Sequence, residues 1–149
     1  MRFKLLITVL LFVFISQSAL AQLDPFEDYD ISEALWNITL VKVDPNMGDD
    51  YLEGLKDTWV AANKVAVELG QIEEFSIFRS VLPQSGDVNL FLVTKFANSD
   101  QLDPNKENYA KFMKAWGDAN EERTREITKD YPGMRKITGE YLVREITIK

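Results

Sequence analysis

The chain has 149 residues, with 24 acidic and 17 basic side chains and a formal net charge of −7. It contains no cysteine and no histidine. These two absences exclude disulfides, thiolate nucleophiles, imidazole bases and every metal site that depends on cysteine or histidine ligands. The functions that remain are catalysis by carboxylate, lysine or tyrosine side chains, binding of an oxygen-ligated cation, or a role without catalysis.

Residues 1–21 have the three-part layout of a secretory signal peptide. Arg2 and Lys4 form a basic start, an apolar core of eleven residues runs from Leu5 to Ile15, and Ala19-Leu20-Ala21 is a small-residue cleavage site. The apolar run is shorter than the ~20 residues that span a bilayer. We therefore expect cleavage after Ala21, a secreted or periplasmic protein, and no membrane association of the mature chain.

Residues 22–33 form an acidic segment that we interpret as a flexible leader, because five of the ten residues from Asp24 to Glu33 are acidic and no periodicity is present. Without the signal peptide the chain keeps 15 basic and 24 acidic side chains, a formal charge of −9. Such a charge disfavours nucleic acid and anionic membrane surfaces as partners. Residues 34–149 are then long enough for one domain with its own core.

The domain is expected to open with a strand over 35–43, where β-branched and aromatic residues precede Pro45. A helix should begin near Asp49 or Asp50, since Asp50 and Glu53 have the spacing of a capping box, and should end at Gly70. Its buried face is predicted from apolar residues that recur every three or four positions: Leu52, Leu55, Trp59, Ala62, Ala66 and Leu69.

Two strands over 73–83 and 88–96 flank the turn sequence PQSGD and should pair as a hairpin. A second helix is predicted over 105–130, with an exposed or partner-facing second half, NEERTRE, that is poor in apolar residues. Tyr131-Pro132-Gly133 should end this helix. A last strand is expected over 140–149.

The resulting order β-α-β-β-α-β is the ferredoxin-like plan, an α+β fold with two helices on one face of a four-stranded antiparallel sheet. The predicted strands carry apolar residues on both faces, and a sheet of that kind must bury both. Because two helices cover only one face, we expect a homodimer in which the second faces of two copies meet. An RNA-recognition domain has the same element order, but strand 88–96 lacks the glycine-rich, basic and aromatic signature of that class.

The segment N-I-T-L-V-K-V-D-P, residues 37–45, followed by a helix, resembles the opening strand of the dimeric α/β-barrel superfamily, in its antibiotic-biosynthesis-monooxygenase-like and stress-responsive branches. The resemblance extends over residues 36–148 as a matter of layout. It implies two ferredoxin-like sheets packed face to face. Several such proteins begin this strand with a histidine that lines a ligand pocket; the aligned residue here is Asn37, which carries no acid–base function.

Asn37 and Thr39 place an amide and a hydroxyl in the middle of an otherwise apolar strand. They could orient a small apolar or aromatic ligand in a pocket, or they could satisfy each other, a buried water or helix-end carbonyls. The aromatic residues that we expect to supply the walls of such a pocket are Trp59, Phe91, Trp116 and Tyr141.

A weaker hypothesis is an anion clamp made by Arg79, Lys95 and Arg144, although charged residues in strands more often protect edges or form ion pairs. The acidic segment 44–50 has some of the spacing of a calcium loop but lacks its glycine and its final glutamate. We therefore predict no metal and no cofactor.

Three functions remain open. We favour an exported, non-catalytic homodimer that binds a small apolar or aromatic molecule. The resemblance also implies a cofactor-independent oxygenase or cyclase acting on an aromatic or polyketide-like substrate. The third is an accessory subunit that packs on another exported protein through the polar half of helix 105–130.

Overall fold

The computed structural model describes residues 22–82 and 86–149. The predicted signal peptide lies outside these residues. Within them, no helix combines the length and the apolar character that crossing a membrane would require.

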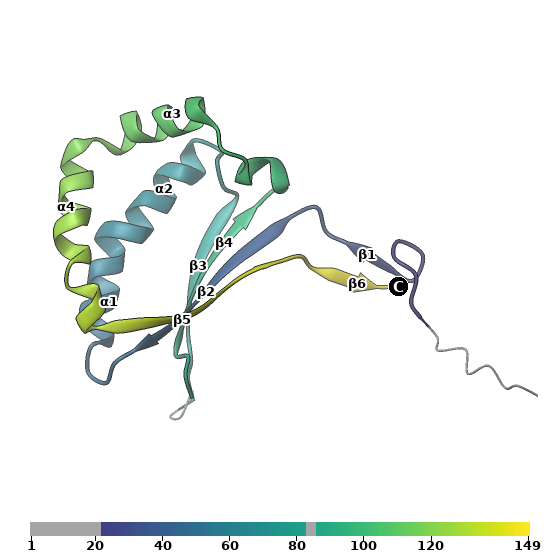
Figure 1. The fold of residues 1–149 in the computed structure, drawn as a ribbon, viewed down its shortest axis with the longest axis horizontal. Coiled ribbons are helices and arrows are strands. Elements are labelled where there is room, and N and C mark those ends of the chain that lie inside the picture. Colours follow the sequence, from purple (N-terminus) through teal and green to yellow (C-terminus); the bar gives the residue numbers. More distant parts are fainter. Residues whose placement is uncertain (1–21, 83–85) are drawn as a thin grey trace, which may run out of the picture.

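The core of the domain is a four-stranded antiparallel sheet made of β2 (Leu35–Val43), β3 (Glu74–Arg79), β4 (Leu90–Phe96) and β5 (Arg135–Val143). The strand order is β3-β4-β2-β5, so the first and third strands of the sheet lie at its centre. Helical segments occupy one side of the sheet (Figure 1). This arrangement confirms the ferredoxin-like α+β fold, and the bounds of β2 agree with the prediction.

The first helical layer is one run of three consecutive segments: α1 (Gly48–Leu55), the π-helical η1 (Lys56–Val60) and α2 (Ala61–Glu68). Gly70 ends the run in a left-handed conformation with φ 67°, as expected for a C-terminal glycine. The predicted capping box is wrong. Met47 is the N-cap and makes no side-chain cap bond, so Asp49 and Asp50 lie inside the first turn, where their charge suits the helix dipole.

The second helical layer is broken where we predicted one helix over 105–130. A 3₁₀ turn η2 (Ser99–Leu102) precedes α3 (Lys106–Trp116), which Asn105 caps by accepting a hydrogen bond from the Asn108 amide at 2.9 Å. Gly117 then adopts φ 77° and ψ 156°, and α4 (Asp118–Thr128) continues in a different direction (Figure 1). The 3₁₀ turn η3 (Tyr131–Gly133) leads into β5.

Substitution of Gly117 by alanine should destabilise the fold, because φ and ψ at this position lie in a region that is essentially restricted to glycine. We expect a loss of about 1–3 kcal/mol in the free energy of unfolding, measured by urea denaturation. Gly133→Ala is the matched control: its φ is not positive, and no atom lies within 4 Å of the position that a Cβ would take. Equal effects of the two substitutions would contradict this explanation of the break.

The two ends of the described chain pair with each other, which the prediction of a flexible leader and a single last strand did not include. β1 (Tyr29–Ile31) and β6 (Ile146–Ile148) form an antiparallel ribbon, with Ile31 opposite Ile146. Arg144 links the two strands where the ribbon leaves the sheet, because it donates hydrogen bonds to the carbonyls of Ser32 and Glu33 at 2.9 and 2.6 Å. We call residues 22–33 and 144–149 the arm, which leaves the sheet and projects from the domain (Figure 1).

The register of the strands separates the two faces of the sheet. The helix-facing side carries the buried core, which consists of Val41, Val43, Leu90 and Leu92 from the sheet packed on Tyr51, Leu55 and Tyr131. The opposite side, here called the open face, carries a second set of apolar residues that pair across the strands: Trp36, Ile38, Leu40, Phe78, Phe91, Val93, Tyr141 and Val143. The predicted two-sided apolar sheet is therefore present, and the helices of the described chain lie on one side of it.

Candidate functional site

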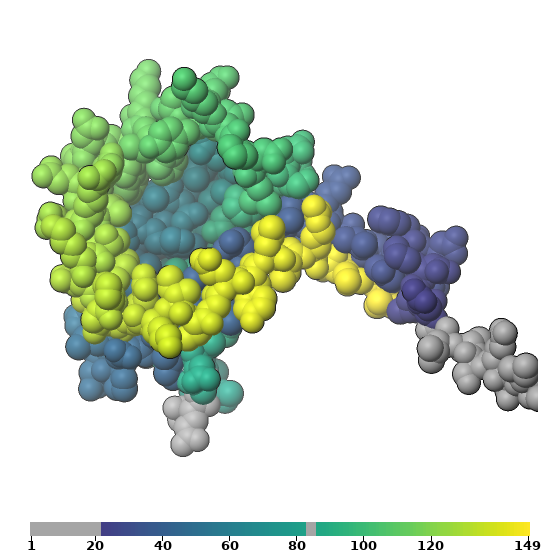
Figure 2. All heavy atoms as spheres, in the orientation of Figure 1, coloured from purple at the N-terminus to yellow at the C-terminus, as the bar shows by residue number. Residues whose placement is uncertain are grey.

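A cavity of about 480 Å³ lies between the helix-facing side of the sheet and the two helical layers. Figure 2 shows a hollow in the surface where α4 and β5 border the run of α1 to α2. The volume falls in the range of small-molecule sites, about 300–1,000 Å³. Its apolar wall is formed by Val41, Leu55, Trp59, Ala62, Leu92 and Ile137.

The π-helical segment η1 and a bulge in β5 determine which side chains reach this cavity. η1 contains Thr58 and Trp59, and both line the cavity. In β5 the register shifts by one residue, since Leu40 pairs with Gly139 but Val41 pairs with Ile137. A bulge of this kind redirects side chains, and here it lets Arg135, Ile137 and Glu140 face the same cavity.

Two tyrosines and an arginine form the polar centre of the site. The rings of Tyr51 and Tyr131 meet edge to face with centroids 5.0 Å apart. The guanidinium carbon of Arg135 lies 6.0 Å from the Tyr51 centroid and 5.6 Å from the Tyr131 centroid. Both distances allow cation–π attraction, so the rings hold the guanidinium at the edge of the core.

Hydrogen bonds fix the Tyr131 ring from the helix side. The Thr58 hydroxyl lies 2.6 Å from the Tyr131 hydroxyl and 2.9 Å from the Gly54 carbonyl oxygen. A carbonyl oxygen can only accept, so the single Thr58 proton goes to Gly54 and Tyr131 donates to Thr58. Gly54 also allows this approach sterically, because a Cβ there would lie 2.9 Å from a Tyr131 ring carbon.

Both phenols at the site remain protonated at neutral pH. Burial raises the pKa of Tyr51, and the adjacent Arg135 guanidinium offsets part of the rise. Burial likewise raises the pKa of Tyr131, with a smaller opposite effect from its hydrogen bond to Thr58. The cavity therefore offers neutral hydroxyl groups and one permanent positive charge.

Two polar atoms at the site lack hydrogen-bond partners within the described part of the chain: the buried Nε of Arg135 and the buried hydroxyl of Thr124. Arg135 also forms no ion pair with any carboxylate in residues 22–82 and 86–149. Glu140 lines the same cavity but is exposed to solvent. A half-buried guanidinium without a counter-charge is an uncommon arrangement in a protein interior.

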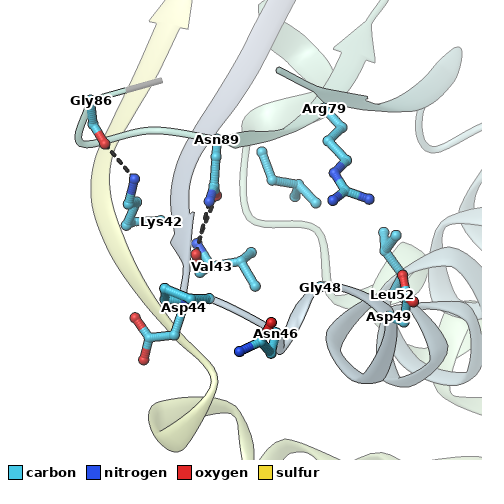
Figure 3. Close-up of a pocket in the computed structure, with 12 residues that line it drawn as sticks. Lys42, Val43, Asp44, Asn46, Gly48, Asp49, Leu52, Arg79, Gly86 and Asn89 are labelled. Atoms are coloured by element: carbon cyan, nitrogen blue, oxygen red, sulfur yellow. Dashed lines mark hydrogen bonds between the residues drawn. The ribbon is translucent and has the colours of Figure 1, made fainter. Parts of the chain in front are cut away.

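A second hollow, of about 660 Å³, lies where β2 runs into α1 (Figure 3). The Asn89 side chain organises it by accepting from the Val43 amide at 2.7 Å and donating to the Val43 carbonyl at 2.8 Å. Asp44 and Arg79 lie on opposite sides of this hollow, and the Asp44 carboxylate points away from it (Figure 3). Its charged groups thus do not converge on one point.

No cluster of three potential metal ligands occurs among the residues that the structure describes.

The structure brings together two of the six residues predicted for a pocket. Thr39 and Trp59 line the 480 Å³ cavity. Asn37 is on the same face of β2 but lies opposite Thr94 and Leu142 in the strand register, outside the cavity lining.

The other three predicted pocket residues lie elsewhere. Trp116 is buried and stacks on Phe112 in α3, with centroids 6.1 Å apart. Phe91 and Tyr141 lie on the open face, on the far side of the sheet from the cavity. The prediction combined side chains from both faces, because strand alternation alone could not decide which face the helices cover.

The residues of the predicted anion clamp lie apart. Arg79 lines the second hollow, Lys95 pairs with Glu73 at 3.0 Å over the Trp36 ring, and Arg144 holds the arm. Sequence reasoning instead missed Tyr51, Thr58, Tyr131 and Arg135. The available signal was Tyr131 beside Pro132, which we interpreted only as the end of a helix.

Neither the family models nor the curated proteins include a match to this chain. Solved structures similar to it include HapK from Hahella chejuensis, with 12% identity and a TM-score of 0.44 over 74% of this chain and 91% of that chain. A dimeric protein of unknown function and ferredoxin-like fold from Bacteroides fragilis has 12% identity and a TM-score of 0.42, over 80% and 100% of the two chains. An uncharacterised NIPSNAP-like domain protein from Burkholderia xenovorans has 11% identity and a TM-score of 0.43, over 78% and 85%. The assignment of the fold rests on the strand order of this chain itself.

Proposed function

We propose that this protein is an exported homodimer of the dimeric α/β-barrel type, in the manner of its antibiotic-biosynthesis-monooxygenase-like and stress-responsive branches, and that each copy binds a small apolar or aromatic molecule without transforming it. The observation that carries the proposal is the 480 Å³ cavity with an apolar wall and a small polar centre. Export is supported by the layout of residues 1–21.

The open face supports the dimer. It presents eight apolar side chains on four adjoining strands, and Phe78 and Tyr141 are 57% and 55% exposed in the single chain. Contiguous apolar surface of this kind marks an interaction site in soluble proteins. Packing against a second sheet would bury it, as in other face-to-face sheets.

The charges around the open face favour a second copy of the same chain as its occupant. Lys42 and Lys136 lie directly opposite each other at one end of this face, where like charges repel. The arm, at the other end, carries five acidic residues between Asp24 and Glu33. A two-fold axis running across the strands would place the acidic arm of each copy against the lysines of the other.

The site supports binding better than catalysis. Its phenols have raised pKa values and are protonated at neutral pH, so neither is poised as a general base. The accessory-subunit role has less support. The residues of α4 are mostly charged or polar, and its Ile127 packs against the core of this chain. Lys129, directly after α4, pairs locally with Glu126 at 2.7 Å.

Filling the cavity should abolish ligand uptake. Ala62 lies in the cavity wall, so Ala62→Phe should occupy the space a ligand needs, whereas Ala110→Phe places the same ring on the exposed side of α3. Native mass spectrometry of the mature chain, purified from its own compartment, should show a dimer with extra mass for the wild type and for Ala110→Phe. Ala62→Phe should show a bare dimer.

Two results would contradict the proposal. A wild-type protein with no extra mass in any preparation argues against a bound molecule. A monomer of the mature chain would mean that something other than a second copy covers the open face.

A further inference from the structure

We propose that the molecule bound in this cavity is an amphipathic monoanion, a small aromatic or aliphatic carboxylate whose charged end pairs with the Arg135 guanidinium. The inference rests on the proposed function and names the ligand class of the same site. Its starting point is a half-buried positive charge that forms no ion pair within the described part of the protein.

Among the described residues, Arg135 is the one basic residue in the lining of the cavity. Its buried Nε has no hydrogen-bond partner, and its guanidinium forms no ion pair with those residues. The Tyr51 and Tyr131 rings at 6.0 and 5.6 Å compensate part of the lost hydration through cation–π attraction. Aromatic faces do not satisfy N–H donors as an anionic oxygen does, so the site retains unused binding capacity for an anion.

The geometry of the surrounding groups favours a carboxylate over a neutral molecule. A guanidinium presents its N–H groups as a planar fork that matches two carboxylate oxygens. The ligand should carry only one negative charge. Arg135 is the single cation in the described lining, and the exposed Glu140 carboxylate would repel a second negative charge.

The rest of the cavity suits an apolar body attached to that charged end. Leu55 and Leu92 are buried core residues, with Trp59 partly buried against them, and all three line the cavity. The lining thus has one cationic end and a largely apolar wall. An anion without an apolar portion, such as acetate, would leave this wall unfilled.

The test compares two probes of nearly the same shape, 2-naphthoate and 2-naphthamide, by calorimetric titration of the mature chain from Gln22 at pH 7. The carboxylate should bind at least roughly ten-fold more tightly, because hydrogen bonds to charged groups are substantially stronger than neutral ones. Arg135→Gln should lower the affinity for naphthoate by roughly ten-fold or more and that for naphthamide by less, because the amide carbonyl also accepts from the guanidinium but carries no charge. Arg135→Lys should be intermediate, since it keeps the charge but loses the fork.

Arg125→Gln, at an exposed position of α4, is the matched control and should leave both affinities unchanged. Equal affinity of the wild-type protein for the two probes overturns the anion assignment and leaves the apolar cavity of the proposed function standing. Failure of both probes to bind, together with a bare mass in the native spectrum, overturns both proposals. The wild-type comparison decides between these outcomes even if Arg135→Gln fails to fold.

Discussion

Phe91→Asp should dissociate the proposed dimer into folded monomers. Phe91 lies on the open face of β4, in register with Leu40 on one side and Phe78 on the other, so its side chain sits in the middle of the apolar surface. A carboxylate buried there between two sheets would lose its hydration without gaining a partner. We expect the dimer dissociation constant to rise roughly 100-fold or more, in line with changes at interface hot spots.

Analytical ultracentrifugation over a range of concentrations measures this shift. Tyr109→Asp is the matched control, because Tyr109 is an aromatic residue of α3 that is 65% exposed and lies away from the open face. That variant should remain dimeric. Circular dichroism must show that Phe91→Asp keeps its fold. A folded Phe91→Asp dimer with unchanged affinity would show that the open face is not the interface.

Tyr131→Ala should cause a large loss of stability. Tyr131 is 6% exposed and contacts both the first helical layer and the sheet, through Tyr51 of α1, Thr58 of η1 and Arg135 of β5. Removing the ring leaves a cavity in the core and exposes the guanidinium to a void. We expect the free energy of unfolding to fall by about 3–5 kcal/mol, the range for large aromatic truncations.

Tyr131→Phe separates the ring from its hydroxyl. It removes only the bond to Thr58, whose own proton already goes to the Gly54 carbonyl, so no donor on Thr58 is left unsatisfied. The expected loss is about 0.5–1.5 kcal/mol. All variants should be denatured with urea at the same protomer concentration, because the stability of the proposed dimer would depend on concentration. Equal losses for the two substitutions would mean that the hydroxyl, rather than the packed ring, holds the site together.

The sequence predicted the fold well where a local signal and the tertiary structure agree. β2 has a clear run of β-branched residues and ends before Pro45, and both of its bounds were correct. The break at Gly117 was missed because apolar residues continue at helical spacing on either side, through Trp116 and Ile127. The pairing of β1 with β6 joins segments more than a hundred residues apart, and a local pattern of apolar residues cannot predict such a distant contact.

The site was less predictable because it depends on three departures from regular geometry. The π-helical η1 alters the helical phase at Thr58 and Trp59, the bulge in β5 changes which residues face inward, and Gly54 permits the close approach of Tyr131. Spacing rules assume regular helices and strands. They placed Thr39 and Trp59 near a pocket but gave no reason to select Arg135.

The order in which strands pair also determines when this domain can finish folding. β2 has β5 as one neighbour and β1 has β6 as its strand partner, so neither early strand can complete its pairing before residues 135–148 have been made. During synthesis β2 therefore has a free edge until residues 135–143 have been made, and closing such a long loop is slow. For the export that we propose, late completion would be an advantage to a chain that crosses a membrane unfolded, because its first and last segments would meet only after both have crossed.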